Sequence, residues 1–266
     1  MSPNMLIAYK NIGETPLECL ERVRKEGNID KDIPMTYAGR LDPMAKGLMI
    51  LLVGEECKNK DKYLGLDKTY EFQILVGFST DTYDLLGLVN PEYTNSSHLN
   101  FLYGGSDTDS DFIYSEVENT LNKFIGTFTQ KYPPFSSKTV GGKQLFQLSK
   151  DDELPEGLPE HEVTIYKLSC TNTEVYDKDK LQKEIFRKVD LVKGDFRQRE
   201  IIDNWNSILN NTDKKEFEII SCICECSSGT YIRQLVADIS KEVGAPMVTY
   251  SINRTKVGQY SIDDKS

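Results

Sequence analysis

Residues 36–58 read TYAGRLDPMAKGLMILLVGEECK, and this stretch organises the predicted fold. Gly39 and Pro43 flank Asp42, and a proline fixes its own φ while restricting the residue before it to extended geometry. After Gly47 the chain continues as LMILLVG, an apolar run of strand length that is typical of a strand buried on both faces. The sequence therefore predicts a carboxylate held on a stiff turn beside a core strand.

The carboxylate of Asp42 has two interpretations at this point. An acid whose position is fixed before a substrate arrives suits nucleophilic or acid–base chemistry. Aspartate is also a common turn residue that hydrogen-bonds its own backbone and carries no chemistry. The loop alone leaves both open.

Length and composition indicate a globular chain with a substantial core. The 266 residues are 38% hydrophobic and could form one large domain or two ordinary ones. The N-terminus has no basic flank followed by a long apolar stretch, and no run reaches the ~20 apolar residues that a membrane span needs. We therefore expect a cytoplasmic protein.

The cysteines do not indicate a metal centre. Three of them alternate in CICEC at residues 222–226, which places them on one face of a strand. Such neighbours do not make a tetrahedral zinc site without a second cluster, and only His98 and His161 could supplement them. We interpret the cysteines as buried thiols in a reducing compartment and expect no metal ligand.

Charge is unevenly distributed along the chain. The net charge is −10, yet residues 119–150 carry five lysines and no acid. Residues 81–118 carry eight acids and no Lys or Arg, and they include a GGSDTDSD tract at 104–111 that we interpret as a surface insertion. The basic segment could meet a polyanion despite the acidic total.

Hydrophobic periodicity predicts alternating strands and helices. Tyr70 and Phe78 are expected at the two ends of one inward strand face, and Trp205 in a core between two helices. We expect strands at residues 6–9, 48–54, 70–78, 162–170, 217–226 and 249–261. We expect helices at residues 16–26, 116–125 and 143–150, around 181–189 and 201–209, and in a segment capped by Ser228 or Thr230 and ended by Gly244.

Two side chains in these elements occupy positions that indicate a polar interaction. Tyr70 starts the inward face of its strand, where its ring could lie in the core and its hydroxyl in a cleft, although a core tyrosine with a satisfied hydroxyl is the plainer interpretation. Arg233 falls in the first turns of the last helix, where the helix dipole favours acids. A cation at this position therefore indicates an interaction other than with the helix dipole, such as a carboxylate partner.

Short motifs occur in a fixed order along most of the chain. They are K-x-x-G at 10–13, A-G-R-L-D-P-x-A-x-G at 38–47, G-E-x-x-K at 54–58, D-K-x-Y at 67–70, G-x-x-T-D-T-x-D-x-x-G at 77–87, P-P-F-S at 133–136, C-S-S-G-T-Y-I-R at 226–233 and R-T-K-V-G at 254–258. In this order and spacing they resemble the TruB-type pseudouridine synthases, which modify a uridine in the T-loop of tRNA.

The resemblance implies an α+β fold, the pseudouridine synthase fold, with a central mixed, mostly antiparallel sheet flanked by helices and loops. One catalytic domain would span residues 1–266, with an RNA-clasping insertion at about 127–150 and a helical insertion at about 176–212. Bacterial members usually carry a further C-terminal RNA-binding domain. We expect the helical insertion to replace it partly in gripping tRNA, and a solvated helical face remains the alternative.

The same resemblance implies catalytic roles for three residues. Asp42 would be the nucleophile that attacks the ribose of the target uridine, so that uracil detaches and rejoins through carbon without a cofactor. Arg233 would pair with Asp42 and aim it. Tyr70 would lie against the flipped base and help to remove the proton from C5.

Further residues match family positions that contact the substrate. Tyr231 and Ile252 would line the base. Tyr37 stands where many members have a histidine that occupies the space vacated by the flipped base, and its ring could fill the same gap. The remaining expected RNA contacts are Arg40, Lys10, Lys68, Lys138 and Arg254.

These features predict isomerisation of uridine to pseudouridine in the T-loop of tRNA (uridine-55 type) by a monomer that binds the tRNA T-arm. The alternatives are a pseudouridine synthase acting on ribosomal or other RNA, or a catalytically silent RNA-binding protein on the same scaffold. Retention of Asp42, Tyr70 and Arg233 together argues against a silent binder. A hydrolase using Asp42 would need a second carboxylate at a recognisable spacing.

Overall fold

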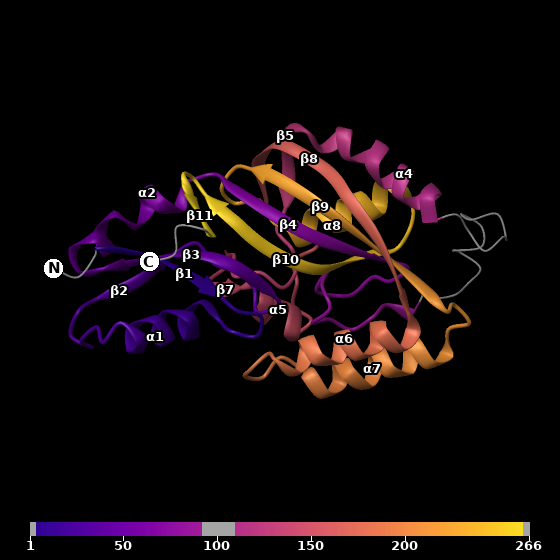
Figure 1. The fold of residues 1–266 in the computed structure, drawn as a ribbon, viewed down its shortest axis with the longest axis horizontal. Coiled ribbons are helices and arrows are strands. Elements are labelled where there is room, and N and C mark those ends of the chain that lie inside the picture. The colour runs from indigo at the N-terminus through magenta and orange to yellow at the C-terminus, as the bar shows by residue number, and fades with distance from the viewer. Residues whose placement is uncertain (1–3, 92–109, 263–266) are drawn as a thin grey trace.

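The structure is a computed structural model that describes residues 4–91 and 110–262 (Figure 1). Most of the acidic tract at 104–111 and His98 lie outside the described residues. Within the described chain, one sheet is formed by β1 (Met5–Lys10), β2 (Met35–Ala38), β3 (Ala45–Val53), β4 (Lys68–Val76), β5 (Gly126–Lys131), β8 (Glu160–Asp177), β9 (Glu216–Cys226), β10 (Met247–Val257) and β11 (Tyr260–Ser261).

The sheet contains both parallel and antiparallel strand pairs. The strands run β1-β3-β10-β4-β9-β8-β5, with β2 paired to β3 and β11 paired to β10. The pairing of β10 with β3 is parallel, and the other pairs in this sheet are antiparallel. The predicted α+β fold with a mixed, mostly antiparallel sheet is confirmed.

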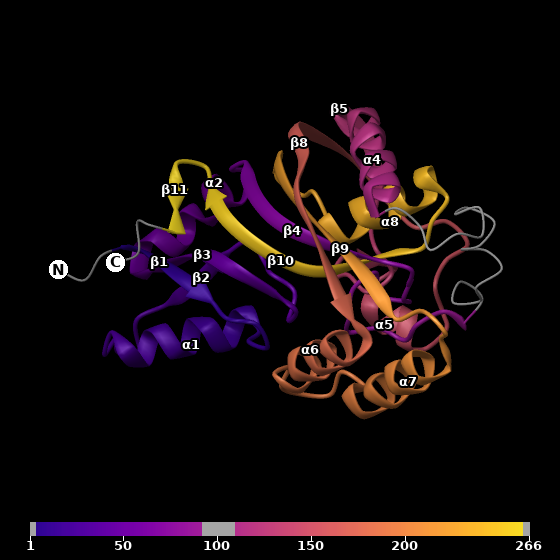
Figure 2. The same cartoon turned by 45° about the vertical axis from the view of Figure 1, so that its right-hand side comes forward.

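Helices lie on both faces of the sheet, as Figure 2 shows for α4 and α8 on one side and α6 and α7 on the other. The helices are α1 (Pro16–Glu26), α2 (Lys60–Leu64), α4 (Ser110–Leu121), α5 (Leu145–Lys150), α6 (Lys178–Asp190), α7 (Gln198–Asn211) and α8 (Ile232–Val243). The small hairpin of β6 (Thr139–Val140) and β7 (Lys143–Gln144) precedes α5.

Alternation along β4 builds two hydrophobic cores. Ile74 points into the cluster that contains Leu235 of α8. Its neighbour Leu75 points to the other face, into the cluster that contains Ile185 of α6 and Trp205 of α7. Successive strand residues face opposite ways, so one strand serves both cores. The predictions that the two later helices pack on each other or on the sheet, and that Trp205 lies in their core, are confirmed.

The predicted face of Phe78 is wrong. β4 ends at Val76, and Gly77 then takes a positive φ of 101° that turns the chain. Phe78 therefore joins the opposite core from Tyr70, with its ring centroid 5.1 Å from that of Trp205.

Two element boundaries also differ from the prediction. The helix expected at 116–125 is α4, which starts earlier and gives way to a 3-10 turn, η3 (Asn122–Phe124). The strand expected at 162–170 extends to Asp177 because β8 pairs with β9 along its whole second half. Most side chains of that half are exposed or half-buried, so no apolar alternation marks it in the sequence.

The predicted side-chain cap of α8 is wrong. The helix begins at Ile232 without a side-chain capping bond. Ser228 instead donates its hydroxyl to the backbone carbonyl of Leu64, and Thr230 donates to the carbonyl of Ser227 at 3.0 Å. Both hydroxyls therefore hold the loop before the helix rather than the helix itself.

Other predicted helix ends are confirmed. Thr15 and Glu18 form a reciprocal capping box at the start of α1, with each side chain bonded to the other's backbone N–H. Gly244 ends α8 in the left-handed conformation, at φ 75°.

Gly47 allows β3 and β10 to run side by side. Gly47 pairs with Arg254 in the parallel ladder and has a φ of 124°. A Cβ atom at Gly47 would lie 2.4 Å from the backbone oxygen and 2.5 Å from the backbone nitrogen of Arg254. Both the backbone conformation and the contact with β10 therefore require glycine.

We predict that Gly47→Ala lowers the free energy of unfolding by about 2 kcal/mol or more, because it combines a strained φ with a backbone clash. Gly54→Ala isolates the cost of a positive φ, since nothing lies within 4 Å of a Cβ there. Urea unfolding of the two variants measures the difference. Equal destabilisation would show that β10 moves aside without cost.

Candidate active site

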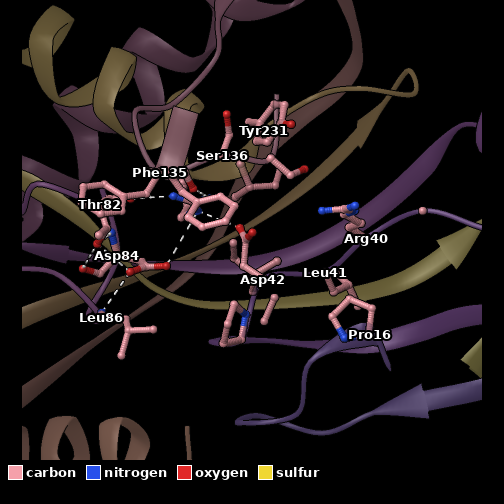
Figure 3. A pocket seen from close by; sticks show the side chains of 18 of the residues that line it. Pro16, Arg40, Leu41, Asp42, Thr82, Asp84, Leu86, Phe135, Ser136 and Tyr231 are labelled. Carbon is pink, nitrogen blue, oxygen red and sulfur yellow. Dashed lines mark hydrogen bonds and ion pairs between the residues drawn. The ribbon is translucent and has the colours of Figure 1, made fainter. Parts of the chain in front are cut away.

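A cavity of about 600 Å³ opens beside the Asp42 loop (Figure 3). Its volume lies within the ~300–1,000 Å³ that is usual for ligand pockets. The lining residues come from segments spread over the chain, namely 37–45, 64–70, 82–86, 135–137, 146–150, 195–197, 228–233 and 252–254, together with Pro16. The cavity therefore brings together most of the motifs that the sequence carries in order, along with segments that belong to none of them.

Backbone-directed hydrogen bonds hold the loop that carries Asp42. Lys10 is fully buried and donates from Nζ to the carbonyl of Ala45 at 2.6 Å. The N–H of Gly13 donates to the carbonyl of Pro43 at 2.9 Å. Burial lowers the pKa of Lys10 to about 8. The K-x-x-G motif thus fixes the turn on the C-terminal side of Asp42.

Arg254 holds the other end of the same loop. Its Nη1 donates to the carbonyl of Arg40 at 3.1 Å, and its Nε donates to the carbonyl of Leu48 at 2.9 Å. The side chain is buried, although it also lines the cavity. Arg254 therefore connects β10 to the start of β3 and to the residues just before Asp42.

Arg233 and Asp42 form the central ion pair of the cavity. Nε of Arg233 lies 2.7 Å from Oδ2 of Asp42. The other two guanidinium nitrogens donate to the carbonyls of Thr82 at 2.8 Å and Phe135 at 3.1 Å. Arg233 is 3% exposed and Asp42 is 37% exposed, so the carboxylate faces the cavity while its partner is enclosed. This pairing accounts for a cation in the first turn of α8.

Asp84 is a second carboxylate beside the same guanidinium. Its Oδ2 lies 3.8 Å from Nε of Arg233, and its Oδ1 accepts hydrogen bonds from the hydroxyl of Thr82 and the N–H of Leu86. Burial raises the pKa of Asp84 to about 6, and the charge of Arg233 opposes that rise. Figure 3 shows Asp84 to the left of Asp42.

Tyr70 lies with its ring in the core and lines the cavity. Burial raises the pKa of Tyr70 to about 12, against the opposing charge of Arg254. The phenol is therefore neutral near pH 7, where its hydroxyl donates or accepts a hydrogen bond. The raised pKa disfavours the phenolate form at that pH.

Most of the expected substrate-binding residues line the cavity. Tyr231 lies at the start of α8, where its ring meets that of Tyr132 edge-on, with 5.6 Å between the ring centroids. Burial raises the pKa of Tyr231 to about 12. The others that line the cavity are Tyr37, Arg40, Lys68, Ile252 and Arg254.

Two expected RNA contacts do not line the cavity. Lys10 is enclosed by the loop that it supports, so its predicted contact with RNA is wrong for this structure. Lys138 lies with its Nζ 4.8 Å from the centroid of the Tyr132 ring, outside the cavity. Because Tyr132 stacks on His161 and contacts Tyr231, Lys138 belongs to an aromatic cluster beside the cavity.

The basic segment is less positive than its sequence indicates. Lys123 pairs with Glu242 at 3.0 Å. Lys131 lies 4.0 Å from Glu160, and Lys143 lies 2.6 Å from Glu153. Acids from outside the segment therefore partly neutralise three of its five lysines.

The residues of the site that were not predicted include Thr82, Asp84, Phe135 and Arg197. Thr82 and Asp84 lie in the T-D-T-x-D motif, and Phe135 lies in P-P-F-S. Both motifs contributed to the family resemblance, but the sequence assigned no role to these three residues. Arg197, which also lines the cavity, falls in no motif.

Residues 4–91 and 110–262 contain no group of three or more His, Cys, Asp or Glu side chains placed to hold a metal ion. Over the same residues, no helix has the length and apolar character needed to cross a membrane.

Comparison with known proteins places these observations in a family. The family model described as TruB family pseudouridylate synthase (N terminal domain) matches residues 33–194. The chain is 28% identical over 255 residues to a tRNA pseudouridine synthase B of Limosilactobacillus reuteri, covering 96% of this chain and 67% of that protein. It is 26% identical over 259 residues to a tRNA pseudouridine synthase B of Aquifex aeolicus, covering 97% and 70%.

Solved structures agree in fold. A crystal structure of a Cbf5-Nop10-Gar1 complex matches with a TM-score of 0.54 at 14% identity, covering 98% of this chain. The structure of an H/ACA RNP bound to a substrate RNA containing 2′-deoxyuridine matches with a TM-score of 0.53 at 13% identity. The chain spans about half the length of these solved chains, 50% and 49% respectively.

The mixed sheet and the family match together place the protein among the pseudouridine synthases. Within that class, the chain belongs to the TruB family.

We predict that turnover falls as the pH drops through about 6, because Asp84 then takes up a proton and Arg233 loses one of its two anionic neighbours. Asp84→Asn should be slower at pH 7.5 and should lack this acidic decline. The pH dependence of kcat measures both.

Unfolding does not explain the same decline. The pKa of Asp84 is higher in the folded protein than its ordinary 3.8, so proton uptake at this group favours the folded state as the pH falls from about 6. Circular dichroism at each pH provides the control. An unchanged acidic decline in Asp84→Asn would assign the decline to another group.

We predict that Tyr70→Phe binds RNA within about threefold of the wild type but turns over about 100-fold more slowly, because the ring keeps its packing while the hydroxyl is lost. Tyr166→Phe is the matched control, since Tyr166 is exposed and lies outside the cavity lining. Single-turnover rates and RNA affinity are measured for both variants. Wild-type turnover in Tyr70→Phe would restrict Tyr70 to a contact role.

Proposed function

We propose that this protein converts a uridine in the T-loop of tRNA, of the uridine-55 type, into pseudouridine. One observation carries the proposal: the Asp42 carboxylate faces a nucleotide-sized cavity while its partner Arg233 is enclosed behind it. Membership of the TruB family and the names of the curated relatives support the tRNA substrate.

Asp42 acts as the nucleophile in this proposal. Its carboxylate oxygen forms a bond to C1′ of the ribose while the bond from C1′ to N1 breaks, and the bonding electrons leave with uracil. The detached ring turns so that C5 bonds to C1′, and Asp42 is released. A proton leaves C5 and a proton joins N1, so the product is an isomer and no cofactor is consumed.

Arg233 assists the first step of this reaction, and Tyr70 assists the last. The bond of Arg233 to Oδ2 fixes the direction in which Asp42 presents its oxygens. Because Tyr70 is a neutral phenol, it relays the C5 proton through its hydroxyl rather than removing it as a phenolate.

The target base must leave its stack before Asp42 reaches it, at a cost of a few kcal/mol. Aromatic and apolar side chains that line the cavity offset this cost through contact with the base. We assign Tyr231 and Ile252 to the everted uracil, and Tyr37 to the space that it vacates. The neutral phenol of Tyr231 suits such a contact.

RNA binding is proposed for two segments. The insertion at about 127–150 contributes Phe135 and Lys150 to the cavity lining, and the helical insertion at about 176–212 contributes residues 195–197. We propose that both contact the T-arm of tRNA, bound by a monomer of one catalytic domain. The free cysteines, several of them buried, are consistent with a cytoplasmic location.

Asp42→Asn tests the reaction. The amide keeps the shape and a hydrogen-bond acceptor for Arg233 but loses nucleophilicity, so we expect no pseudouridine and a tRNA affinity within about threefold of the wild type. Asp32→Asn, an exposed site outside the cavity lining, is the matched control and should retain activity.

The substrate is a T-loop transcript with or without the target uridine, and the product is mapped by a pseudouridine-specific chemical read-out. Normal turnover in Asp42→Asn would exclude the nucleophile. Product in ribosomal RNA fragments but not in T-loops would replace the proposed substrate with another RNA.

A further inference from the structure

The connection between α6 and α7 forms part of the cavity wall. The two helices lie side by side in both views (Figures 1 and 2), and they are inserted between β8 and β9. Asp195, Phe196 and Arg197 at the end of the connection line the cavity. An element that the motifs do not account for therefore reaches the site.

Arg197 joins this connection to two other walls. Its Nη2 lies 2.9 Å from Oδ2 of Asp81, and its guanidinium carbon lies 4.9 Å from the centroid of the Phe135 ring. Asp81 is itself fixed, because its Oδ1 accepts a hydrogen bond from the N–H of Leu88 at 2.8 Å. One side chain thus contacts the T-D-T-x-D loop and the P-P-F-S turn together.

Those two segments are the ones that hold Arg233. Thr82, the neighbour of Asp81, supplies one carbonyl to the guanidinium of Arg233, and Phe135 supplies the other. A continuous chain of contacts therefore runs from Arg197 through the two segments to Arg233 and on to Asp42.

The backbone around Arg197 is held in an uncommon conformation. Arg197 has a φ of 62°, in the left-handed region that residues other than glycine adopt at a cost. Gln198 braces the preceding turn: its amide donates to the carbonyls of Val192 and Gly194, and its Oε1 accepts from the N–H of Phe196. This bracing supports the direction in which Arg197 points.

The far end of the connection packs against Gly13, in the turn after β1. A Cβ atom at Gly13 would lie 2.1 Å from the backbone oxygen of Leu191, so the two backbones are in close contact there. Gly13 is the residue whose N–H donates to the carbonyl of Pro43. The connection between α6 and α7 therefore also contacts the turn that supports the Asp42 loop.

We infer that Arg197 is a positioning residue for the ion pair of Arg233 and Asp42, acting through Asp81 and Phe135. This inference rests on the proposed function. Arg197 is 24% exposed and Asp81 is 34% exposed, and an ion pair with that exposure contributes little to stability. Misplacement of a catalytic group by about 1 Å can lower the rate about 100-fold. The effect of Arg197 therefore falls on turnover more than on folding.

Arg197→Ala and Arg197→Lys test the inference. We expect kcat to fall about tenfold or more in Arg197→Ala with tRNA affinity within about threefold of the wild type, because the walls that hold Arg233 separate. Arg197→Lys keeps the charge opposite Asp81 but lacks the planar group over Phe135, so it should recover part of the loss.

Two further variants test whether the effect of Arg197 passes through Asp81. Asp81→Asn combined with Arg197→Ala should be no slower than the slower single variant, because both changes break one contact. Arg24→Ala is the matched control: Arg24 also bridges segments, through the carbonyls of Asp30 and Ile33, and lies outside the cavity lining. Its kcat should equal that of the wild type.

A read-out without catalysis separates this inference from the proposed function. The Nε–H proton of Arg233, bonded to Asp42, should exchange with solvent about tenfold faster by NMR in Arg197→Ala than in the wild type. Unchanged exchange would overturn the inference even if the wild type formed no pseudouridine. Loss of tRNA affinity with unchanged kcat would also overturn it and make Arg197 an RNA contact.

Discussion

The ion pair of Arg233 with Asp42 is the interaction on which the site depends. Arg233 is almost wholly enclosed, and a guanidinium removed from water is costly unless its donors are paired. Its nitrogens are paired with one carboxylate and with the carbonyls of Thr82 and Phe135. Because these partners come from three distant segments, the requirements of one cation bring those segments around a common cavity. The cavity exists where it does because Arg233 is buried there.

Two other enclosed cations act on the same segment. Lys10 and Arg254 are buried, and Nζ of Lys10 and Nε and Nη1 of Arg254 donate to backbone carbonyls of the segment that carries Asp42. Bonds aimed at the backbone fix the path of a loop independently of its side chains. The loop therefore keeps its geometry through bonds to its backbone, and its own side chains remain free to face the cavity.

The fold was predictable wherever burial alternates along the chain, as in β4 and β9. A carboxylate partner for Arg233 was also predictable, because the helix dipole disfavours a cation at that position. The misses share one physical cause, which is that burial and pairing depend on residues distant in sequence. Nothing in the K-x-x-G motif shows that Lys10 is enclosed. The T-D-T-x-D motif contains two acids, and spacing does not show that Asp84 is the buried one. Arg197 lies among interleaved charges without a motif, so only the tertiary contacts with Asp81 and Phe135 show its place.

The separation of 191 residues between Asp42 and Arg233 has a consequence for how the protein is made. During translation, Asp42 emerges from the ribosome long before Arg233, and the Arg254 brace on its loop emerges later still. The ion pair at the centre of the cavity therefore cannot form until Arg233 has been synthesised, and the Asp42 loop reaches its braced geometry only after that.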